Sequence, residues 1–448
     1  MKNWKKILTL AIPSIASFAS MTLTGMINLI MIGNLGALAI AIVGVSNVIM
    51  YNAWAMFSGI GSTVNYLVAQ NYGSNTMKKG LDRTFLALIF GSVAGIFTML
   101  VGFFGAEGIL RVMGSPENMV KEGTLYLQIR FYAMLFSILT FTLFSFFRGI
   151  GDTKTPMYAS IIGNGVMIFF TYSLTYGNLG FPELGLKGAG IALFLGELSA
   201  FILIMYAFFK NLKEKFFIRF NPVFDFLEMK LIFNESFKLG TQEFSKSMAM
   251  LVYTAFVTRL GTNALAANEI SLSVMNLGFM PAAAFGSTAT ILVGQEIGRN
   301  KPHLAKKLGI ETAKIGAIFI LILGTFEFIF AESISKIYTD VPEVFALSAN
   351  LIMISAFLQL FDATAGFFAG GLRGIGDTTF LLRASLIHAW GIFVPLSYLL
   401  VFVFDFGSYG AWIALYGYLT VFGTTMMIRY LRKDFSKVSV KKTFKKTA

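Results

Sequence analysis

The chain has 448 residues, of which 56% are apolar and only 13% are charged, and its mean hydropathy is +0.71. Soluble domains carry about 25% charged residues, so this composition excludes a soluble globular protein. The chain has no cysteine, which excludes disulfides and thiolate metal sites.

Apolar stretches along the chain are long enough to cross a bilayer, which requires about 20 residues per helix. The basic start "MKNWKKILTL" leads into a stretch too long for a cleavable signal, so we expect it to open the first membrane helix. Because an open sheet cannot satisfy its backbone in lipid, the spans are predicted to be helices. Twelve are predicted, at about 7–33, 44–70, 83–106, 121–147, 156–178, 188–209, 232–258, 266–295, 310–330, 343–371, 380–403 and 409–430.

The positions of the basic residues that produce the net charge of +13 indicate what the charge is for. If the N-terminus lies inside, most Lys and Arg residues lie at cytoplasmic loops and ends, and the outer loops hold only Arg111, Lys121, Lys187, Arg259 and Lys336. This bias predicts a multi-pass protein of the inner (plasma) membrane with both termini in the cytoplasm. The basic surface then faces anionic lipid, and no nucleic-acid partner is expected.

The chain contains a long internal repeat. The six residues "RGIGDT" occur at Arg148–Thr153 and again 225 positions later, at Arg373–Thr378. At the same offset, "AQNYGSN" aligns with "GQEIGRN". Agreement over so long a stretch indicates two copies of a six-helix unit. Because six is even, both copies have the same orientation, and the predicted axis between them lies along the membrane normal.

The predicted fold class is therefore all-α integral membrane, with twelve transmembrane helices in two parallel-repeat six-helix lobes related by a pseudo-twofold axis. The predicted domains are an N-terminal lobe at 1–210, a cytoplasmic linker at 211–230, a C-terminal lobe at 231–433 and a basic cytoplasmic tail at 434–448.

Each "RGIGDT" follows the fourth helix of its half. Its glycines permit a tight turn, and Asp and Thr can cap the following helix. A structural corner is the favoured interpretation. The alternative is a gate closed by an ion pair, Arg148–Asp152 in one half or Arg373–Asp377 in the other.

Acidic and amide side chains within the predicted spans are concentrated in the second half. Buried charge in lipid is costly and therefore suggests function. Three helical faces carry such groups, with Gln242, Glu243 and Lys246 on the first, Glu269, Ser273 and Asn276 on the second, and Ser355, Gln359 and Asp362 on the third. We predict that these faces surround one pocket. Carboxylate and amide oxygens suit a hard cation such as Na⁺, and a desolvated carboxylate can instead hold a proton.

Structural alternatives exist for several of these residues. Glu243 and Lys246 are three positions apart and could neutralise each other. Glu235 and Glu269 lie near span ends and could be interfacial, and Glu327 lies close enough to the outer end to contact water. For His388, a core or interfacial ring is favoured over a proton relay.

Several stretches resemble the multidrug and toxic compound extrusion (MATE) transporters, and the resemblance covers nearly the whole chain. They include "LFSFFRGIGDTKTPMYASIIGNGVMI", "FGSTATILVGQEIGRN" and "FDATAGFFAGGLRGIGDT". A prokaryotic member is implied, with twelve helices and export of organic cations in exchange for Na⁺ or H⁺. In one branch of the family, an acid on helix seven and an Asp on helix ten bind the coupling cation, and Glu243 and Asp362 match them. Asn28 stands where many members have Asp, which argues against a proton site there.

The sequence thus predicts a secondary active antiporter, not an enzyme, with no cofactor and with Na⁺ or H⁺ as coupling ion. The expected substrate is a small organic cation or amphipath, and the expected state is a monomer in the lipid bilayer. The predicted cation-binding residues are Asp362, Glu243, Glu269 and Gln359, with Na⁺ possible at the first two. The predicted substrate cavity contains Asn28, Asn164, Gln242, Asn276 and Lys246.

Three other functions were considered. A lipid-linked oligosaccharide flippase of the same superfamily is the first alternative, but it should hold more cations in its cavity. An intramembrane transferase would need paired acids or a metal motif, and neither DxxD in a loop nor HExxH is present. A channel or receptor would have no evident use for a parallel repeat.

Overall fold

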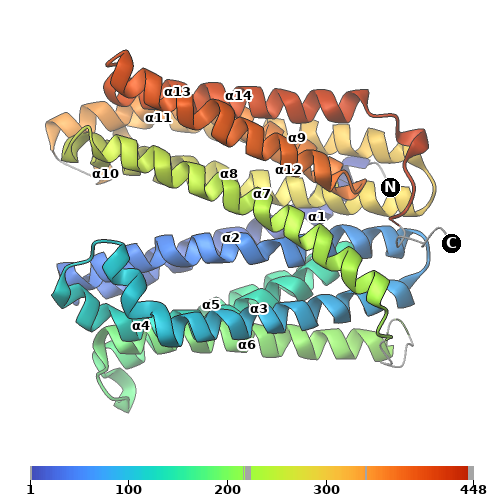
Figure 1. Ribbon diagram of the computed structural model, residues 1–448, viewed down its shortest axis with the longest axis horizontal. Helices are drawn as coiled ribbons and strands as arrows, with labels where there is room; N and C mark the ends of the chain where they lie inside the picture. The colour runs from blue at the N-terminus through green and yellow to red at the C-terminus, as the bar shows by residue number, and fades with distance from the viewer. Residues whose placement is uncertain (1–2, 215, 217–222, 339–340, 442–448) are drawn as a thin grey trace. The chain divides into compact units, whose positions relative to one another are not determined.

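The computed structural model describes residues 3–214, 216, 223–338 and 341–441, and these ranges contain helices and no strand. Figure 1 shows that the long helices run side by side within each half of the chain. The first half contains α1 (Asn3–Gly33), α2 (Ala37–Gly73), α3 (Met77–Val112), α4 (Glu117–Gly149), α5 (Lys154–Tyr176), the 3₁₀ turn η1 (Asn178–Gly180) and α6 (Gly185–Glu214). The second half contains α7 (Phe226–Thr258), α8 (Thr262–Gly298), α9 (Pro302–Ile329), α10 (Ala331–Tyr338), α11 (Pro342–Gly374), α12 (Thr378–His388), η2 (Ala389–Phe393), α13 (Val394–Tyr398), η3 (Leu399–Val403), α14 (Gly407–Arg432) and η4 (Phe435–Lys437).

The helices follow the predicted spans, although most extend beyond them. In the described ranges, eleven helical runs are long and apolar enough to cross a membrane, with Thr378–Val403 counted as one run that includes two π-helical turns. The remaining long helix is α7, whose first turns carry Glu228, Lys230, Glu235 and Lys238. The short helix α10 was not predicted, because its eight residues mix charged and apolar side chains.

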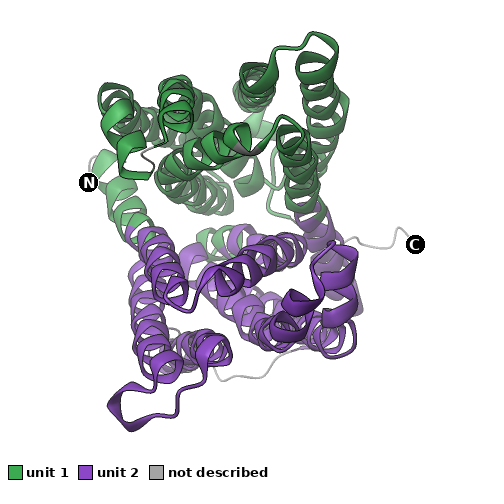
Figure 2. Cartoon of the chain, turned by 90° about the vertical axis from the view of Figure 1, so that its left-hand side faces the viewer, with its two compact units in different colours: residues 1–15, 69–75, 241–441 green, residues 16–68, 76–240, 442–448 purple. Residues whose placement is uncertain are grey.

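The chain divides into two compact units, coloured separately in Figure 2. One consists of residues 16–68, 76–240 and 442–448, and the other of residues 1–15, 69–75 and 241–441. The residues 442–448, which belong to the predicted basic tail, lie outside the described residues, as do 215 and 217–222 of the predicted linker. Of the rest of that linker, the first residues continue α6 and the last residues begin α7.

The unit built mainly from the first half holds its helices together through glycine contacts and buried ion pairs. A Cβ at Gly95 of α3 would lie 2.8 Å from the Cα of Leu135 on α4, so the GxxxG pair Gly91 and Gly95 allows close packing there. The first turns of α7 also belong to this unit. Their Glu228 accepts a 2.8 Å hydrogen bond from Nε of Arg83, which is 1% exposed.

The same unit satisfies a second acid of α7. Glu235 is fully buried, accepts a 2.8 Å hydrogen bond from the Tyr66 hydroxyl and pairs with Lys238 at 3.0 Å. Of the alternatives for Glu235, the structure shows a buried and fully partnered carboxylate rather than an interfacial one. Pairing of this kind is needed because an isolated charge is very costly in a medium without water.

In the other unit, α11 is the central helix and packs against α8, α9 and α14. The crossing of α8 and α11 places backbone on backbone, because a Cβ at Gly370 would overlap the carbonyl of Gly286. The Thr290 hydroxyl adds a 2.9 Å hydrogen bond to the Gly370 carbonyl. Helices in lipid depend on such close approach, since burial from water does not drive them together there.

The ends of α1 and α2 that belong to this unit are held by polar contacts. Lys6 pairs with the buried Glu296 at 3.2 Å. The amide of Gln70 donates to the Gly374 carbonyl at 2.8 Å and accepts from the backbone N–H of Lys441 at 2.8 Å. Gln70 and Gly374 both belong to segments that repeat along the sequence.

The two "RGIGDT" corners have the same backbone but different side-chain partners. Gly151 and Gly376 both adopt left-handed φ angles, of 85° and 80°, as a tight turn requires. Asp152 accepts hydrogen bonds from the backbone of Lys154 and Thr155 at the start of α5. These contacts are those of a structural corner.

Asp377 instead pairs with Arg429 at 2.8 Å and with Lys433 at 3.1 Å. The alternative ion pairs Arg148–Asp152 and Arg373–Asp377 are absent among the described residues. Arg148 instead lies over the Phe18 ring.

We predict that the two corners respond differently to the same substitution. Asp152→Asn keeps an oxygen that can cap α5 and should change the free energy of unfolding by less than about 0.5 kcal/mol. Asp377→Asn removes the negative charge that holds two basic side chains and should cost about 1 kcal/mol. Thermal unfolding in detergent measures both, and equal losses in the two variants would contradict this assignment.

Candidate functional site

The candidate site begins with three charged side chains on α7 and α11. Glu243 and Lys246 lie one turn apart on α7, and their Oε1 and Nζ atoms are 3.1 Å apart. A guanidinium nitrogen of Arg373, on α11, lies 4.0 Å from the same Glu243 oxygen. Glu243 therefore lies between two cations. The sequence did not decide whether Glu243 and Lys246 neutralise each other. The structure shows that they form an ion pair.

Asp362 lies on α11 in the same unit and is half-buried. The charges that act on it are those of Lys246 and Glu243. Tyr418 of α14 lies within electrostatic range of both Asp362 and Glu243. Nevertheless, Asp362 has neither a hydrogen bond nor an ion pair with any described residue. It is thus a carboxylate close to a charged pair but without a partner of its own.

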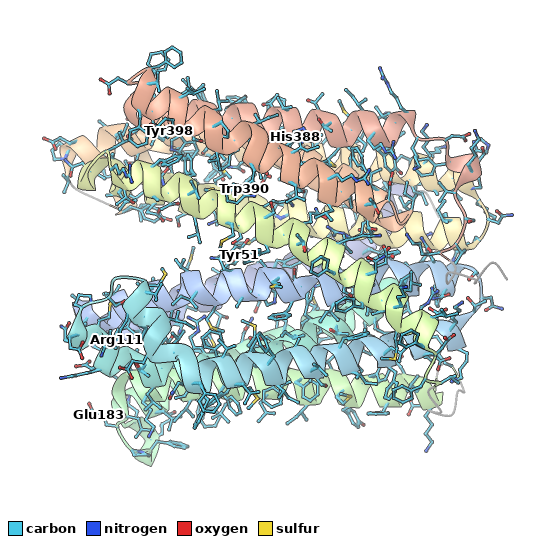
Figure 3. All side chains as sticks on the ribbon, viewed as in Figure 1. Tyr51, Arg111, Glu183, His388, Trp390 and Tyr398 are labelled. Carbon is cyan, nitrogen blue, oxygen red and sulfur yellow. The ribbon has the colours of Figure 1, made fainter. Side chains whose placement is uncertain are left out.

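Aromatic side chains surround this group. Lys246 Nζ lies 5.6 Å from the centre of the Phe422 ring, and the Tyr418 ring stacks on Phe422. Trp390 donates a 3.0 Å hydrogen bond to the Ser245 hydroxyl from η2, a π-helical turn. Such turns are frequent at functional sites. Figure 3 marks Trp390 and, two residues earlier, His388.

His388 belongs to the packed interior of this unit. Its ring is 9% exposed, with Nδ1 near the Ala384 carbonyl at 2.7 Å and Nε2 near the Thr425 hydroxyl at 3.1 Å. Both nitrogens therefore have partners, which agrees with the favoured interpretation of a core ring.

Two of the four predicted cation-binding residues have other partners. The side-chain amide of Gln359 donates to the Glu327 carboxylate on α9, not to Asp362. Glu269 is exposed and accepts a 3.5 Å hydrogen bond from Asn268. The interactions of Glu269 do not include Asp362 or Glu243. Among the described residues, Gln359 is thus linked to α9, and no hydrogen bond or ion pair links Glu269 to Asp362 or Glu243, so one pocket formed by the three helical faces stays a prediction.

The expectation that Glu327 contacts water is wrong. Its side chain is 1% exposed, and α11 packs against this part of α9 through Gln359 and Ala356. The position near a span end suggested water, but only the packing shows which face of α9 is covered.

The predicted cavity residues are divided between the two units. Asn28 and Asn164 lie in the unit built mainly from the first half. There Asn28 accepts a 3.1 Å hydrogen bond from the Thr171 hydroxyl, and Asn164 donates one of 2.8 Å to Ser20.

The unit that contains residues 241–441 holds the other three predicted cavity residues, Gln242, Asn276 and Lys246. Asn276 is exposed. Gln242 is 1% exposed, and neither its amide nitrogen nor its amide oxygen has a hydrogen-bond partner among the described residues.

The sequence-based prediction placed neither Tyr418 nor Glu197 in a site, and it gave Arg373 only as part of the alternative gate. Arg373 could have been found, since it follows Asp362 by three turns of one helix. Ser137, which occupies the position of Asp362 in the first repeat, is hydrogen-bonded to the Glu197 carboxylate. Within the described part of the chain, no group of three or more His, Cys, Asp or Glu side chains could hold a metal ion. A cation here would therefore also need amide, hydroxyl or carbonyl oxygens.

Comparison with known families decides the class of the protein. The MatE family model matches residues 13–173 and 240–399, the corresponding parts of the two halves. This chain belongs to the MatE family. The resemblance inferred from the sequence is confirmed, and membership points to a multi-pass membrane transporter rather than an enzyme.

Curated relatives match this MatE protein over nearly its whole length. A probable multidrug resistance protein NorM of Thermotoga maritima is 28% identical, with 97% of this chain and 94% of the relative covered. A probable multidrug resistance protein YoeA of Bacillus subtilis is 26% identical, with 95% and 92% covered.

Solved structures confirm the fold. A MOP superfamily transporter from Pyrococcus furiosus superposes with a TM-score of 0.88 at 19% identity, covering 96% of each chain. A MATE transporter in an outward-facing conformation superposes with a TM-score of 0.87 over the same share of each chain. The predicted all-α fold, with the two-lobe arrangement typical of MATE transporters, is confirmed.

We predict opposite effects for one substitution at two buried glutamines. Gln242→Leu removes polar atoms that lack partners and should leave the free energy of unfolding unchanged or raise it by up to about 1 kcal/mol. Gln359→Leu removes the donor to Glu327 and should lower it by about 1–3 kcal/mol. Thermal unfolding in detergent compares the two, and a larger loss for Gln242→Leu would show that Gln242 has a polar partner.

Proposed function

We propose that this MatE protein is a secondary active antiporter that exports organic cations or amphipathic drugs from the cytoplasm in exchange for Na⁺ or H⁺. It works as a monomer in the inner membrane by alternating access, with both termini in the cytoplasm. The observation that carries the proposal is Asp362, an acid that has no hydrogen bond or ion pair with a described residue and lies within electrostatic range of the Glu243–Lys246 pair. The relatives named as multidrug resistance proteins support drug efflux.

The charges favour Asp362 as the group that exchanges ions. Lys246 and Arg373 both approach Glu243, so an added cation at Glu243 must compete with two resident cations. Asp362 feels the same lysine at longer range but is not bound by it. A coupling ion and a cationic substrate would both be attracted to Asp362. If Asp362 cannot bind the coupling ion and the substrate at the same time, the binding of one releases the other.

Exchange also requires that the two ligands favour different conformations. A ligand shifts a conformational equilibrium only by its difference in affinity for the two states. Competition at Asp362, with substrate favouring one state and the coupling ion the other, provides that difference. Site couplings of this kind are typically about 1–3 kcal/mol.

The aromatic rings near the acids suit the proposed substrates. The Lys246 ammonium already lies over the Phe422 face, which indicates that this ring attracts a cation. Flat apolar cations gain both ring contact and cation–π attraction at such a surface. The flippase alternative is less well supported, because Lys246 and Arg373 approach an acid and are not available to a pyrophosphate.

We predict that Asp362→Asn lowers coupled drug transport in proteoliposomes by at least roughly tenfold, as expected from a lost coupling of more than about 1.4 kcal/mol. Glu243→Gln should lower it less, because Asp362 is retained. Transport is measured first with an imposed Na⁺ gradient and then with an imposed pH gradient, which also identifies the coupling ion.

Two control variants accompany this measurement. Glu269→Gln tests the predicted cation-binding residue whose described contacts include neither Asp362 nor Glu243. Glu107→Gln removes an exposed acid paired with Arg111. Both should transport as the unmodified protein does. Full transport by Asp362→Asn and by Glu243→Gln under both gradients would refute the assignment of the site.

A further inference from the structure

A second acid of the same unit, Glu327, forms no ion pair with any residue that the structure describes. It lies in the last turns of α9 and is 1% exposed. Its one partner among the described residues is Gln359 of α11, whose side-chain nitrogen donates to Oε2 of Glu327. A buried carboxylate that stays ionised without a cation is strongly destabilising, because its charge has lost water and gained no partner.

Among the described contacts, the Glu327–Gln359 pair has one hydrogen bond and leaves one oxygen of each side chain without a donor. Oε1 of Glu327 and Oε1 of Gln359 are both buried and have no hydrogen-bond partner among the residues described. Both atoms are acceptors when the carboxylate is ionised, so neither can satisfy the other. One proton on Oε1 of Glu327 would supply the missing donor. The O–H of a carboxylic acid can then donate to the amide oxygen while an amide N–H donates to the other acid oxygen, so the two groups form two hydrogen bonds together.

The surrounding packing favours this pair and excludes water. A Cβ at Gly278 of α8 would overlap Oε1 of Gln359, so the glycine leaves room for the amide. A Cβ at Gly324 of α9 would likewise overlap the Ala356 carbonyl of α11, so the two helices touch one turn from Glu327. An apolar cluster of Val274, Ala331 and Ile352 lies nearby on α8, α10 and α11.

The helices packed against α9 bring no charge to Glu327. Their ionisable residues are Glu269 and Glu296 on α8, Glu332, Lys336 and Tyr338 on α10, Glu343, Asp362 and Arg373 on α11, and Lys437 on η4. The electrostatic environment of the Glu327 carboxyl is set by its loss of water and by the hydrogen bond from Gln359. None of the ionisable residues named above forms an ion pair with it. A metal cation in place of the proton would need several more oxygen ligands than this pair offers.

We propose that Glu327 binds a proton and that the protonated acid and Gln359 form a closed pair with two hydrogen bonds, a proton-binding site separate from Glu243 and Asp362. The proton comes from water and joins one carboxylate oxygen, and no other bond changes. The site stands independently of the proposed transport function, since it rests on the partners of two buried side chains.

Infrared spectroscopy of the purified full-length protein tests this proposal. A protonated carboxyl has a C=O stretching band that an ionised carboxylate lacks. At neutral pH we expect Glu327→Gln to remove one such band, and Asp362→Asn to leave that band in place. A spectrum of Glu327→Gln with every protonated carboxyl band retained would overturn the proposal.

A second variant keeps the test valid if Glu327→Gln does not fold. Gln359→Leu leaves the acid but removes its hydrogen-bond partner, so the same band should shift to higher frequency. An unmoved band would show that the two side chains do not share a proton. If Na⁺ removes the band from the unmodified protein, the site binds a metal ion and the proton assignment is wrong.

Stability gives an independent check. Glutamine has the shape and neutrality of a protonated glutamate, so Glu327→Gln should unfold within a few degrees of the unmodified protein. A much lower unfolding temperature for Glu327→Gln than for the unmodified protein at neutral pH would show that the negative charge itself is needed, which contradicts a protonated acid. No transport is measured, so the result is distinct from the outcome of the Asp362 experiment.

Discussion

The close crossing of α8 and α11 is the contact on which the second-half unit depends. Gly286 and Gly370 bring the two backbones together, and the Thr290 hydroxyl bonds to the Gly370 carbonyl. This contact holds α11 against α8, and the polar side chains of α11 approach several other helices. Gln359 reaches α9, Arg373 approaches α7, and Asp362 lies near charged and aromatic groups of α7 and α14. The candidate sites are thus consequences of how one helix is packed.

The acids within the helices of this protein differ in whether a basic side chain lies beside them. On α7, Glu228, Glu235 and Glu243 each have a basic partner, as a low-dielectric environment requires. The described contacts give Asp362 and Glu327 no such partner. Asp362 is half-buried, as the proposed exchange of ions at this residue requires. Glu327 is fully covered and bonded to an amide, which favours a bound proton over a bound metal ion.

The two halves share a fold but differ in their polar contacts. The identical "RGIGDT" segments make the same turn, yet Asp152 caps a helix whereas Asp377 holds two basic side chains. Arg148 lies on an aromatic ring, whereas its counterpart Arg373 approaches Glu243. Repeated sequence therefore preserves the backbone, while the side chains of the surrounding helices decide what each repeated residue does.

The sequence by itself determined the membrane class, the long helices, the repeat and the family, because hydropathy and motif spacing are properties of the chain read in order. It also singled out Asp362 and Glu243, since acids are rare in apolar spans. It did not reveal that Gln359 bonds to Glu327 or that Glu269 bonds to Asn268, and it placed Glu327 in water. Those facts depend on which face of each helix is covered and by what. Only the tertiary structure decides this, because the rotation and contacts of a helix are set by packing against residues far away in the sequence.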